Sequence, residues 1–213
     1  MNDPAVPNPT FGVLILAGGR SSRMGADKAS LPYRGVTLLS HMRTLAAQSG
    51  AASVLVGGGA LAELKDPVAG AGPVASLCAL AEYALPETVP SRWVVLPVDM
   101  PMLEPTLIRR LAAAPARAAA FTGHPLPLAL TLDAETRAAF ARVKIRLLAQ
   151  DSVAVRQVLG LLGGQDLGAS DSETAQLINV NTPDEWSRLN DRLPSPRPSP
   201  ASGKGRAPAK PGG

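Results

Sequence analysis

Positively charged residues follow a short apolar run and a turn of small residues near the start of the chain. The run 12–16, Gly-Val-Leu-Ile-Leu, is typical of a strand that is buried on both faces of a parallel sheet. It leads into the Ala-Gly-Gly turn at 17–19, which lets a phosphate or another backbone approach closely. Arg20, Arg23 and Lys28 then place three cations within nine residues. This order favours a site for phosphates, although a solvated basic loop is the alternative.

An aspartate follows a second apolar run in the middle of the chain. The run 93–98 predicts a strand, and Pro97 removes a ladder donor, so the strand must be irregular, at an edge, or ending there. Asp99 comes directly after it, where a carboxylate can hold Mg²⁺ together with substrate phosphates. A helix cap is the structural alternative, but Asp99 lies too far ahead of the helix expected over 104–113 to cap it simply.

Two glycine-rich turns belong to the same predicted sheet edge. The strand expected over 53–56 ends in glycines at 57–59, and the loop 66–73 precedes a helix expected over 74–85. Pro73 suits the first turn of that helix, where a missing N–H costs little. Ligands of open α/β sheets bind at the carboxyl ends of the strands, so these turns are candidate ligand contacts. A glycine-rich helix entry without a ligand is the alternative reading of the loop.

Two asparagines stand near the end of the apolar part of the chain. The segment 177–181, Leu-Ile-Asn-Val-Asn, predicts a short strand. A capping box formed by Thr182 and Glu185 accounts for the helix that should follow. That box leaves Asn179 and Asn181 without a structural explanation.

Four motifs, taken in this order, resemble the molybdenum cofactor guanylyltransferases, a group of nucleotidyltransferases that activate a phosphorylated acceptor with a nucleoside triphosphate. They are LAGGRSSRMGADKA, DPVAGAGP, VLPVDMPML and NVNTPDE, and the resemblance runs from about residue 11 to residue 190. It implies transfer of GMP from GTP to the phosphate of molybdopterin, with Mg²⁺ and with release of pyrophosphate. The acceptor phosphate would attack the α-phosphorus without a protein nucleophile, so positioning and charge neutralisation would carry the catalysis.

The resemblance also implies roles for individual residues. Those expected to contact the nucleotide are Leu16, Ala17, Gly18, Gly19, Arg23, Lys28, Gly57, Asp66 and Asp99. Among them Arg23 and Lys28 would neutralise the triphosphate, and Asp99 would be the metal ligand; these three are the expected catalytic residues. Asn179 and Asn181 would face the active site on the acceptor side.

The chain departs from the family pattern in places that bear on its substrates. Ala69 stands where relatives usually carry proline, and Gly57 where they often carry asparagine. The segment 125–130 on the acceptor side does not align cleanly. One alternative is a cytidylyltransferase acting on molybdopterin or another small phosphorylated acceptor, although its relatives tend to read Leu-Ala-Ala-Gly at the signature. Another is a non-catalytic nucleotide-binding partner in cofactor delivery, against which the joint presence of Lys28 and Asp99 argues.

The second half of the chain offers further acceptor contacts. His124 lies in a turn between two expected strands, where it could meet the acceptor or simply be exposed. A set of cations could also meet an anionic acceptor, although solvated helix faces explain them nearly as well. These cations are Arg142, Lys144, Arg146 and Arg156.

Composition and charge limit the remaining possibilities. The chain has 213 residues, 46% hydrophobic and 18% charged, which predicts one globular domain. Four cations of the Pro/Gly-rich stretch 194–213 account for the net charge of +4, so the rest is formally neutral and no nucleic-acid partner is expected. A single cysteine, Cys78, and the lack of a signal-like or membrane-spanning segment favour a cytoplasmic protein. Molybdoenzymes or cofactor-delivery proteins are possible partners.

Strands that alternate with helices and end in glycines predict a doubly wound, mostly parallel α/β sheet. We expect a flexible arm over 1–9, one nucleotidyltransferase domain over 10–193 and a disordered tail over 194–213. The remaining expected strands span 118–121 and 126–132, and the remaining helices span 38–48, 133–143 and 151–162.

Overall fold

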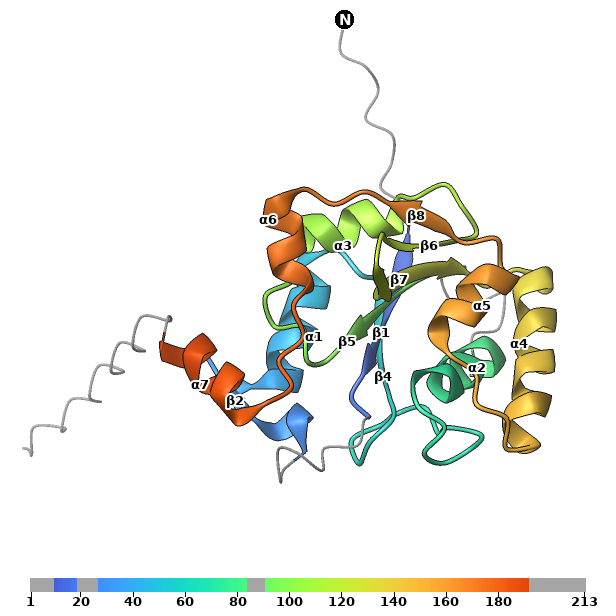
Figure 1. Cartoon of the computed structure of the whole chain (residues 1–213), viewed down its shortest axis with the longest axis horizontal. Coiled ribbons are helices and arrows are strands. Elements are labelled where there is room, and N and C mark those ends of the chain that lie inside the picture. The colour runs from blue at the N-terminus through green and yellow to red at the C-terminus, as the bar shows by residue number, and fades with distance from the viewer. Residues whose placement is uncertain (1–9, 19–26, 84–90, 192–213) are drawn as a thin grey trace, which may run out of the picture.

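The computed structural model describes residues 10–18, 27–83 and 91–191, so the expected arm and tail lie outside the described residues. A six-stranded sheet in the order β4-β1-β5-β7-β6-β8 forms the centre of the molecule (Figure 1). Its strands are β1 (Phe11–Leu16), β4 (Ser53–Gly57), β5 (Arg92–Pro97), β6 (Ala118–Phe121), β7 (His124–Thr131) and β8 (Gln165–Leu167). A separate two-stranded ribbon consists of β2 (Pro32–Tyr33) and β3 (Val36–Thr37).

The strand directions confirm the expected mostly parallel sheet. β1 pairs in parallel with β4 and β5, and β6 pairs in parallel with β8. β7 is antiparallel to both of its neighbours, β5 and β6. The carboxyl ends of β1, β4, β5 and β6 therefore meet the amino end of β7 at one edge of the sheet. This edge gathers the segments that the sequence singled out.

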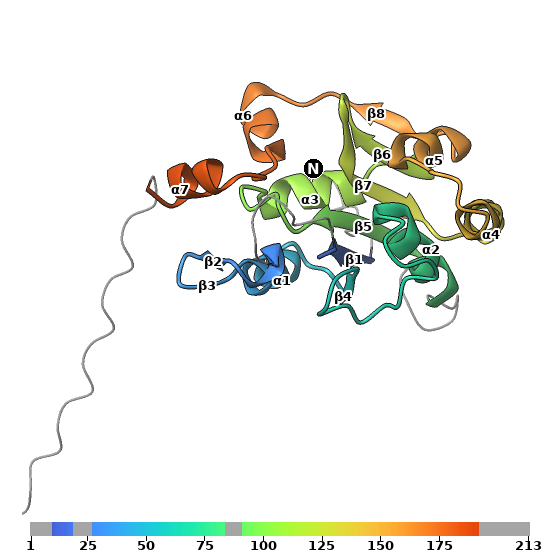
Figure 2. The same ribbon diagram turned by 60° about the horizontal axis from the view of Figure 1, so that its bottom comes forward.

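Helices cover both faces of the sheet, as the doubly wound prediction requires. One face packs on α2 (Pro73–Tyr83), α4 (Ala134–Leu148) and α5 (Val155–Leu161), and the other on α1 (Leu38–Gln48) and α3 (Pro105–Ala112). Alternation along β1 places Leu14 in the first core and Val13 and Ile15 in the second. Figure 2 shows α2 and α4 on one side of β5 and α1 on the other side.

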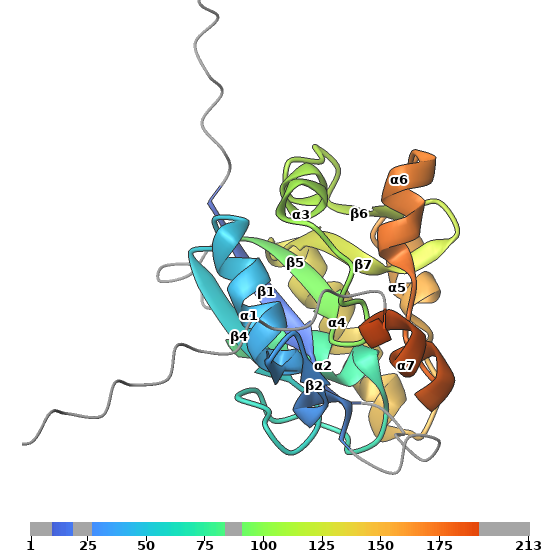
Figure 3. The ribbon, with the colours of Figure 1, turned by 90° about the vertical axis from the view of Figure 1, so that its left-hand side faces the viewer.

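The end of the described chain runs along the outside of this core. It contains α6 (Asp171–Thr174), a 3-10 turn η3 (Ala175–Leu177) and α7 (Pro183–Asp191). α6 and α7, orange and red in Figure 3, follow one another along the same side of the molecule. The ring of Trp186 in α7 lies 5.9 Å from that of Tyr33 in β2, which joins the last helix to the small ribbon.

The predicted strand over 177–181 is wrong. Residues 178–181 lie in no strand of either described sheet. They pass the carboxyl edge of the large sheet, where Asn179 and Asn181 line the same cavity as the ends of β1 and β5. The amide of Val180 donates to the carbonyl of Asp99 at 2.8 Å, so the segment is fixed to the loop after β5. It thereby brings both predicted asparagines to that edge.

Two predicted helix boundaries also shift. α4 continues to Leu148, beyond the expected end at 143, because Val143 and Leu147 both remain buried on one face. α5 begins only at Val155, where Gln157 accepts a 2.9 Å hydrogen bond from the amide of Ala154.

Buried polar groups at the opposite edge of the sheet are structural. Arg92 is 7% exposed and donates to the carbonyls of Ala112, Ala114 and Ala116 at 3.1, 2.9 and 2.8 Å, which completes the end of α3. Burial lowers the pKa of Arg92 to about 10.

The single cysteine, Cys78, is buried in the core, and burial raises the pKa of its thiol to about 12. No helix in the described ranges is long and apolar enough to cross a bilayer.

Candidate functional site

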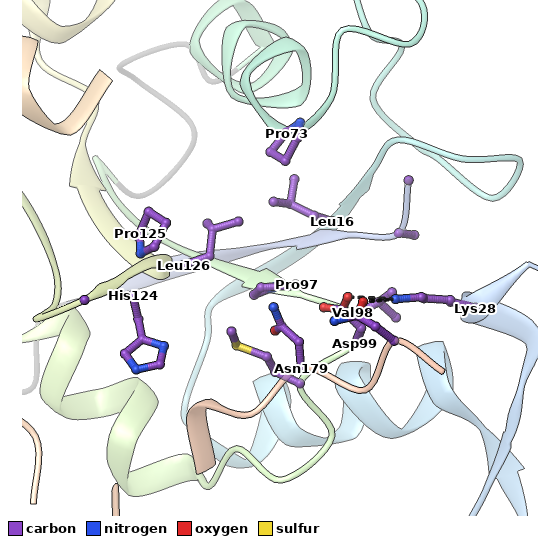
Figure 4. A pocket seen from close by; sticks show the side chains of 15 residues that line it. Leu16, Lys28, Pro73, Pro97, Val98, Asp99, His124, Pro125, Leu126 and Asn179 are labelled. Carbon is purple, nitrogen blue, oxygen red and sulfur yellow. Dashed lines mark hydrogen bonds and ion pairs between the residues drawn. The ribbon is translucent and has the colours of Figure 1, made fainter. Parts of the chain in front are cut away.

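A cavity of about 490 Å³ opens at the carboxyl edge of the sheet, where the ends of β1 and β5 meet the start of β7. Figure 4 shows Lys28 and Asp99 at one side of it, His124 at the other, and Leu16 and Pro73 along the wall between them. Six separate segments of the chain line this cavity. The lining residues predicted from the sequence are Leu16, Ala17, Gly18, Lys28, Asp99, His124, Asn179 and Asn181.

Lys28 joins three of the predicted segments. Its ammonium group lies 2.9 Å from Oδ2 of Asp99, 2.6 Å from Oδ1 of Asn181 and 3.2 Å from the carbonyl oxygen of Val180. These three acceptors match the three N–H groups of a lysine. The side chains of Lys28 and Asp99 are 17% and 20% exposed, so the ion pair is partly shielded from water. The cavity therefore holds a fixed positive and a fixed negative charge side by side.

Local structure explains why Lys28 points into the cavity. It begins a 3-10 turn, η2 (Lys28–Ser30), and the side chain of Asp27 caps that turn by accepting a 3.1 Å bond from the amide of Ala29. Asp99 is held from the other side, because the amide of Val98 donates to the carbonyl of Leu16 at 3.0 Å. Both charged residues are thus placed by backbone contacts of the sheet edge.

Glu185 fixes the asparagine that contacts Lys28. Its carboxylate accepts hydrogen bonds from the amides of Asn181 and Thr182 at 2.7 and 3.0 Å. The predicted capping box is confirmed, since Oγ1 of Thr182 accepts from the amide of Glu185 at 3.2 Å. The bond from Asn181 is the main cause of the lowered pKa of Glu185. The sequence showed Glu185 only as a helix cap, and nothing in its spacing reveals this second contact.

A second hollow, of about 290 Å³, adjoins the cavity and shares Leu16, Gly18 and Pro73 with it. Its walls are mainly glycine, because two loops approach each other very closely there. A Cβ on Gly18 would lie 2.9 Å from Cα of Gly58, and a Cβ on Gly58, whose φ is +70°, would lie 3.0 Å from Gly18. Gly18 is therefore required for contact between loops, in addition to any contact with a ligand.

Asp66 provides the carboxylate of this glycine-lined hollow. Ser76 of α2 donates to its Oδ1 at 2.7 Å, and both side chains line the hollow. Burial raises the pKa of Asp66, and the hydrogen bond from Ser76 opposes that shift. The carboxylate is thus an oriented acceptor in a half-buried setting.

The remaining predicted residues lie elsewhere. Gly57 ends β4 and lines neither hollow; a Cβ there would lie 2.9 Å from Cβ of Ser76, so its small size serves the packing of α2. Gly19 and Arg23 lie outside the described residues. The expected roles of these three residues stay predictions.

The cavity offers few oxygen ligands for a metal ion, which suits a cation that is held mainly by substrate phosphates. The described residues contain no group of three or more His, Cys, Asp or Glu side chains that could hold a metal ion. Asp99 offers one carboxylate at the cavity wall, beside the amide groups of Asn179 and Asn181. Mg²⁺ commonly binds through one or two carboxylates together with substrate phosphates and water. Asp99 fits such a site.

The chain is similar to known proteins over most of its length. A molybdenum cofactor guanylyltransferase from Xanthomonas euvesicatoria is 40% identical over 184 residues, which cover 85% of this chain and 94% of that protein. One from Rhodobacter capsulatus is 33% identical over 84% of this chain and 95% of that protein. The crystal structure of molybdopterin-guanine dinucleotide biosynthesis protein A from Archaeoglobus fulgidus has the same fold, with a TM-score of 0.57, 18% identity, and coverage of 84% of this chain and 97% of that one. Residues 13–161 match the family described as the MobA-like NTP transferase domain, and the chain belongs to this family.

Proposed function

We propose that this protein transfers GMP from GTP to the phosphate of molybdopterin, with release of pyrophosphate. The names of the two relatives that align over most of the chain support the choice of substrates. The observation that carries the proposal is the pairing of Lys28 with Asp99 at 2.9 Å, beside a glycine-lined hollow. A cation, a carboxylate and close backbone approach are what a site for a metal-bound nucleoside triphosphate needs.

The reaction needs no nucleophile from the protein. An oxygen of the acceptor phosphate attacks the α-phosphorus of GTP, a new P–O bond forms, and the bond to the departing pyrophosphate breaks. Lys28 lies where it can neutralise the phosphates as charge moves toward the leaving group. Asp99 would hold Mg²⁺ against the phosphates, and the cation supplies further positive charge when bound. Arg23 would add a second positive side chain.

The glycine-lined hollow would take the guanine end of GTP. Guanine carries a ring N–H next to an amino group, and the carboxylate of Asp66 is oriented to accept hydrogen bonds from such an edge. Cytosine lacks a ring N–H beside its amino group, so it would leave part of this carboxylate unpaired. A site built for hydrogen bonds discriminates strongly against a base that cannot make them.

A test measures pyrophosphate release with GTP, CTP and ATP, each with and without molybdopterin. We expect release only when GTP and molybdopterin are both present. Equal rates with CTP would replace the guanylyl assignment with the cytidylyl alternative. Binding of GTP without release under any condition would support the non-catalytic alternative.

A further inference from the structure

A third hollow, of about 250 Å³, continues from the far side of the main cavity. It shares Gly123, His124 and Pro125 with that cavity and is otherwise lined by α5, β6, β8 and Gly164 of the turn before β8. Lys28 and Asp99 lie at the opposite side of the main cavity (Figure 4). A ligand whose phosphate lies near Lys28 can therefore extend past His124 into this third hollow.

Two unpaired charges of opposite sign line the third hollow. Arg156 of α5 and Asp166 of β8 both belong to it, and neither has a hydrogen-bond or ion-pair partner among residues 10–18, 27–83 and 91–191. Two of the other predicted cations are paired, and Arg142, which like Arg156 has no such partner within the described ranges, lines none of the three hollows. Lys144 pairs with Glu82 at 2.6 Å and Arg146 with Asp151 at 3.3 Å, as on solvated helix faces. Arg156 is thus the member of the predicted basic set that a ligand could use.

The fold holds these two charges on separate but connected elements. Asp166 is in register with Ala120 of β6, whose side chain packs into the core on the α5 side of the sheet. The turn between α5 and β8 is tight, since the amide of Gly164 donates to the carbonyl of Leu159 at 2.8 Å. A Cβ on Gly164 would lie 3.0 Å from that same oxygen. The backbone positions that carry the exposed side chains of Arg156 and Asp166 are therefore fixed by packing.

We propose that the third hollow binds the heterocyclic end of the acceptor, through an edge that carries an amino group and a ring N–H beside a carbonyl group. Asp166 accepts from the two donors, and Arg156 donates to the carbonyl oxygen. Leu159 and Pro125 offer apolar contacts to the faces of a flat ring. This inference rests on the proposed function and identifies Arg156 and Asp166 as specificity residues for a pterin acceptor.

The experiment must separate two sites that could each accept a pterin, because guanine carries the same hydrogen-bonding edge. GTP binding is measured first by calorimetry. The phosphate-free probe 6-hydroxymethylpterin is then titrated by fluorescence in the presence of saturating GTP, which occupies the glycine-lined hollow. The variants are Asp166→Asn and Arg156→Gln. Matched controls are Asp171→Asn and Arg142→Gln, which change exposed residues that line none of the three hollows.

We expect each variant at the third hollow to weaken pterin binding roughly tenfold or more, because the pterin edge loses a charged hydrogen-bonding partner. The affinity for GTP should not change in these variants. The control variants should bind the pterin as tightly as the unaltered protein does. Pterin binding that is absent from the unaltered protein, or equal in all variants, would overturn this inference. Failure of the unaltered protein to bind GTP would instead overturn the proposed function.

Discussion

Lys28 and a bound metal ion would compete for the same carboxylate. The lysine donates to Asp99, Asn181 and the carbonyl of Val180, so each of its N–H groups already has an acceptor within the protein. It can reach a phosphate only by giving up at least one of these bonds. Asp99 likewise gains freedom to hold a cation when Lys28 moves away. We therefore expect metal and nucleotide to bind more tightly together than alone.

A Lys28→Met variant tests this competition, since methionine has a similar length and no charge. Binding of Mn²⁺ to the nucleotide-free protein, followed by electron paramagnetic resonance, should tighten roughly tenfold because Asp99 loses a neighbouring cation. Turnover should fall roughly a hundredfold or more. Arg43→Met is a suitable control, because Arg43 pairs with Glu63 at 2.9 Å on the exposed surface. Unchanged affinity for Mn²⁺ in Lys28→Met would mean that the lysine and the cation do not compete.

The segment at the sheet edge and the helix that follows it are held by the same carboxylate. The carboxylate of Glu185 both caps α7 and holds the backbone of Asn181, whose side chain contacts Lys28. Loss of this carboxylate should release Asn181 and let Lys28 take other positions. Glu185 is thus a positioning residue that acts through Asn181.

A pair of substitutions separates this role from simple capping. Glu185→Ala should lower kcat roughly tenfold with little change in the KM for GTP, because the affected contacts orient Lys28 in the reaction. Glu185→Gln retains an acceptor oxygen and should restore most of kcat. Ser170→Ala removes a comparable cap at α6, which lines none of the three hollows, and is the control. If both helix-cap variants lower the melting temperature alike and neither changes kcat per folded molecule, Glu185 is only a cap.

Features that depend on a single element of the chain could be predicted from the sequence. The apolar runs at β1, β4 and β5 and the proline at the start of α2 were predicted because burial and cap chemistry are local. The segment 177–181 was wrongly predicted as a strand because its apolar and polar residues alternate as they do in a strand. The contact of Asn181 with Lys28 joins residues 153 positions apart, so no local pattern could show it.

The two ends of the parallel strands have different functions in the molecule: buried contacts at one end stabilise the fold, and the candidate active site lies at the other. Arg92 and its carbonyl partners lie at the start of β5, and Lys28 and Asp99 lie at its other end. The sequence motifs indicated the edge that holds the candidate active site. Nothing in the sequence indicated that Arg92 is buried, because a charged residue before an apolar run is usually exposed. The antiparallel direction of β7 follows from the two-residue connection to β6, which allows only a hairpin.

The pH dependence of overall stability should carry a contribution from His41. Its Nε2 lies 3.1 Å from the carbonyl oxygen of Pro101, two residues after Asp99, and its ring packs on Tyr33. Burial lowers the pKa of His41 below its ordinary value, and the bond to Pro101 partly opposes this. The unfolded chain therefore binds more protons at mildly acidic pH. The stabilising contribution is complete above about pH 6.5 and is lost as the pH falls from there through the folded pKa.

Melting temperatures measured between about pH 7.5 and pH 5 should show this loss in the unaltered protein. His41→Gln keeps a donor for the carbonyl of Pro101 and removes the titration, so its melting temperature should fall less over the same range. A parallel decline in both proteins would assign the pH dependence to other groups.

Guanylyl transfer can be tested most directly by following the transferred nucleotide itself. The protein is incubated with GTP labelled at the α-phosphorus, molybdopterin and Mg²⁺, and the label is traced in parallel for Asp99→Asn. We expect label in a molybdopterin-guanine dinucleotide, one pyrophosphate per dinucleotide, and no label left on the protein. We also expect a folded Asp99→Asn protein that forms almost no product, with partial recovery in excess Mn²⁺. Absence of labelled dinucleotide from the unaltered protein, or near-normal transfer by folded Asp99→Asn, would contradict these expectations.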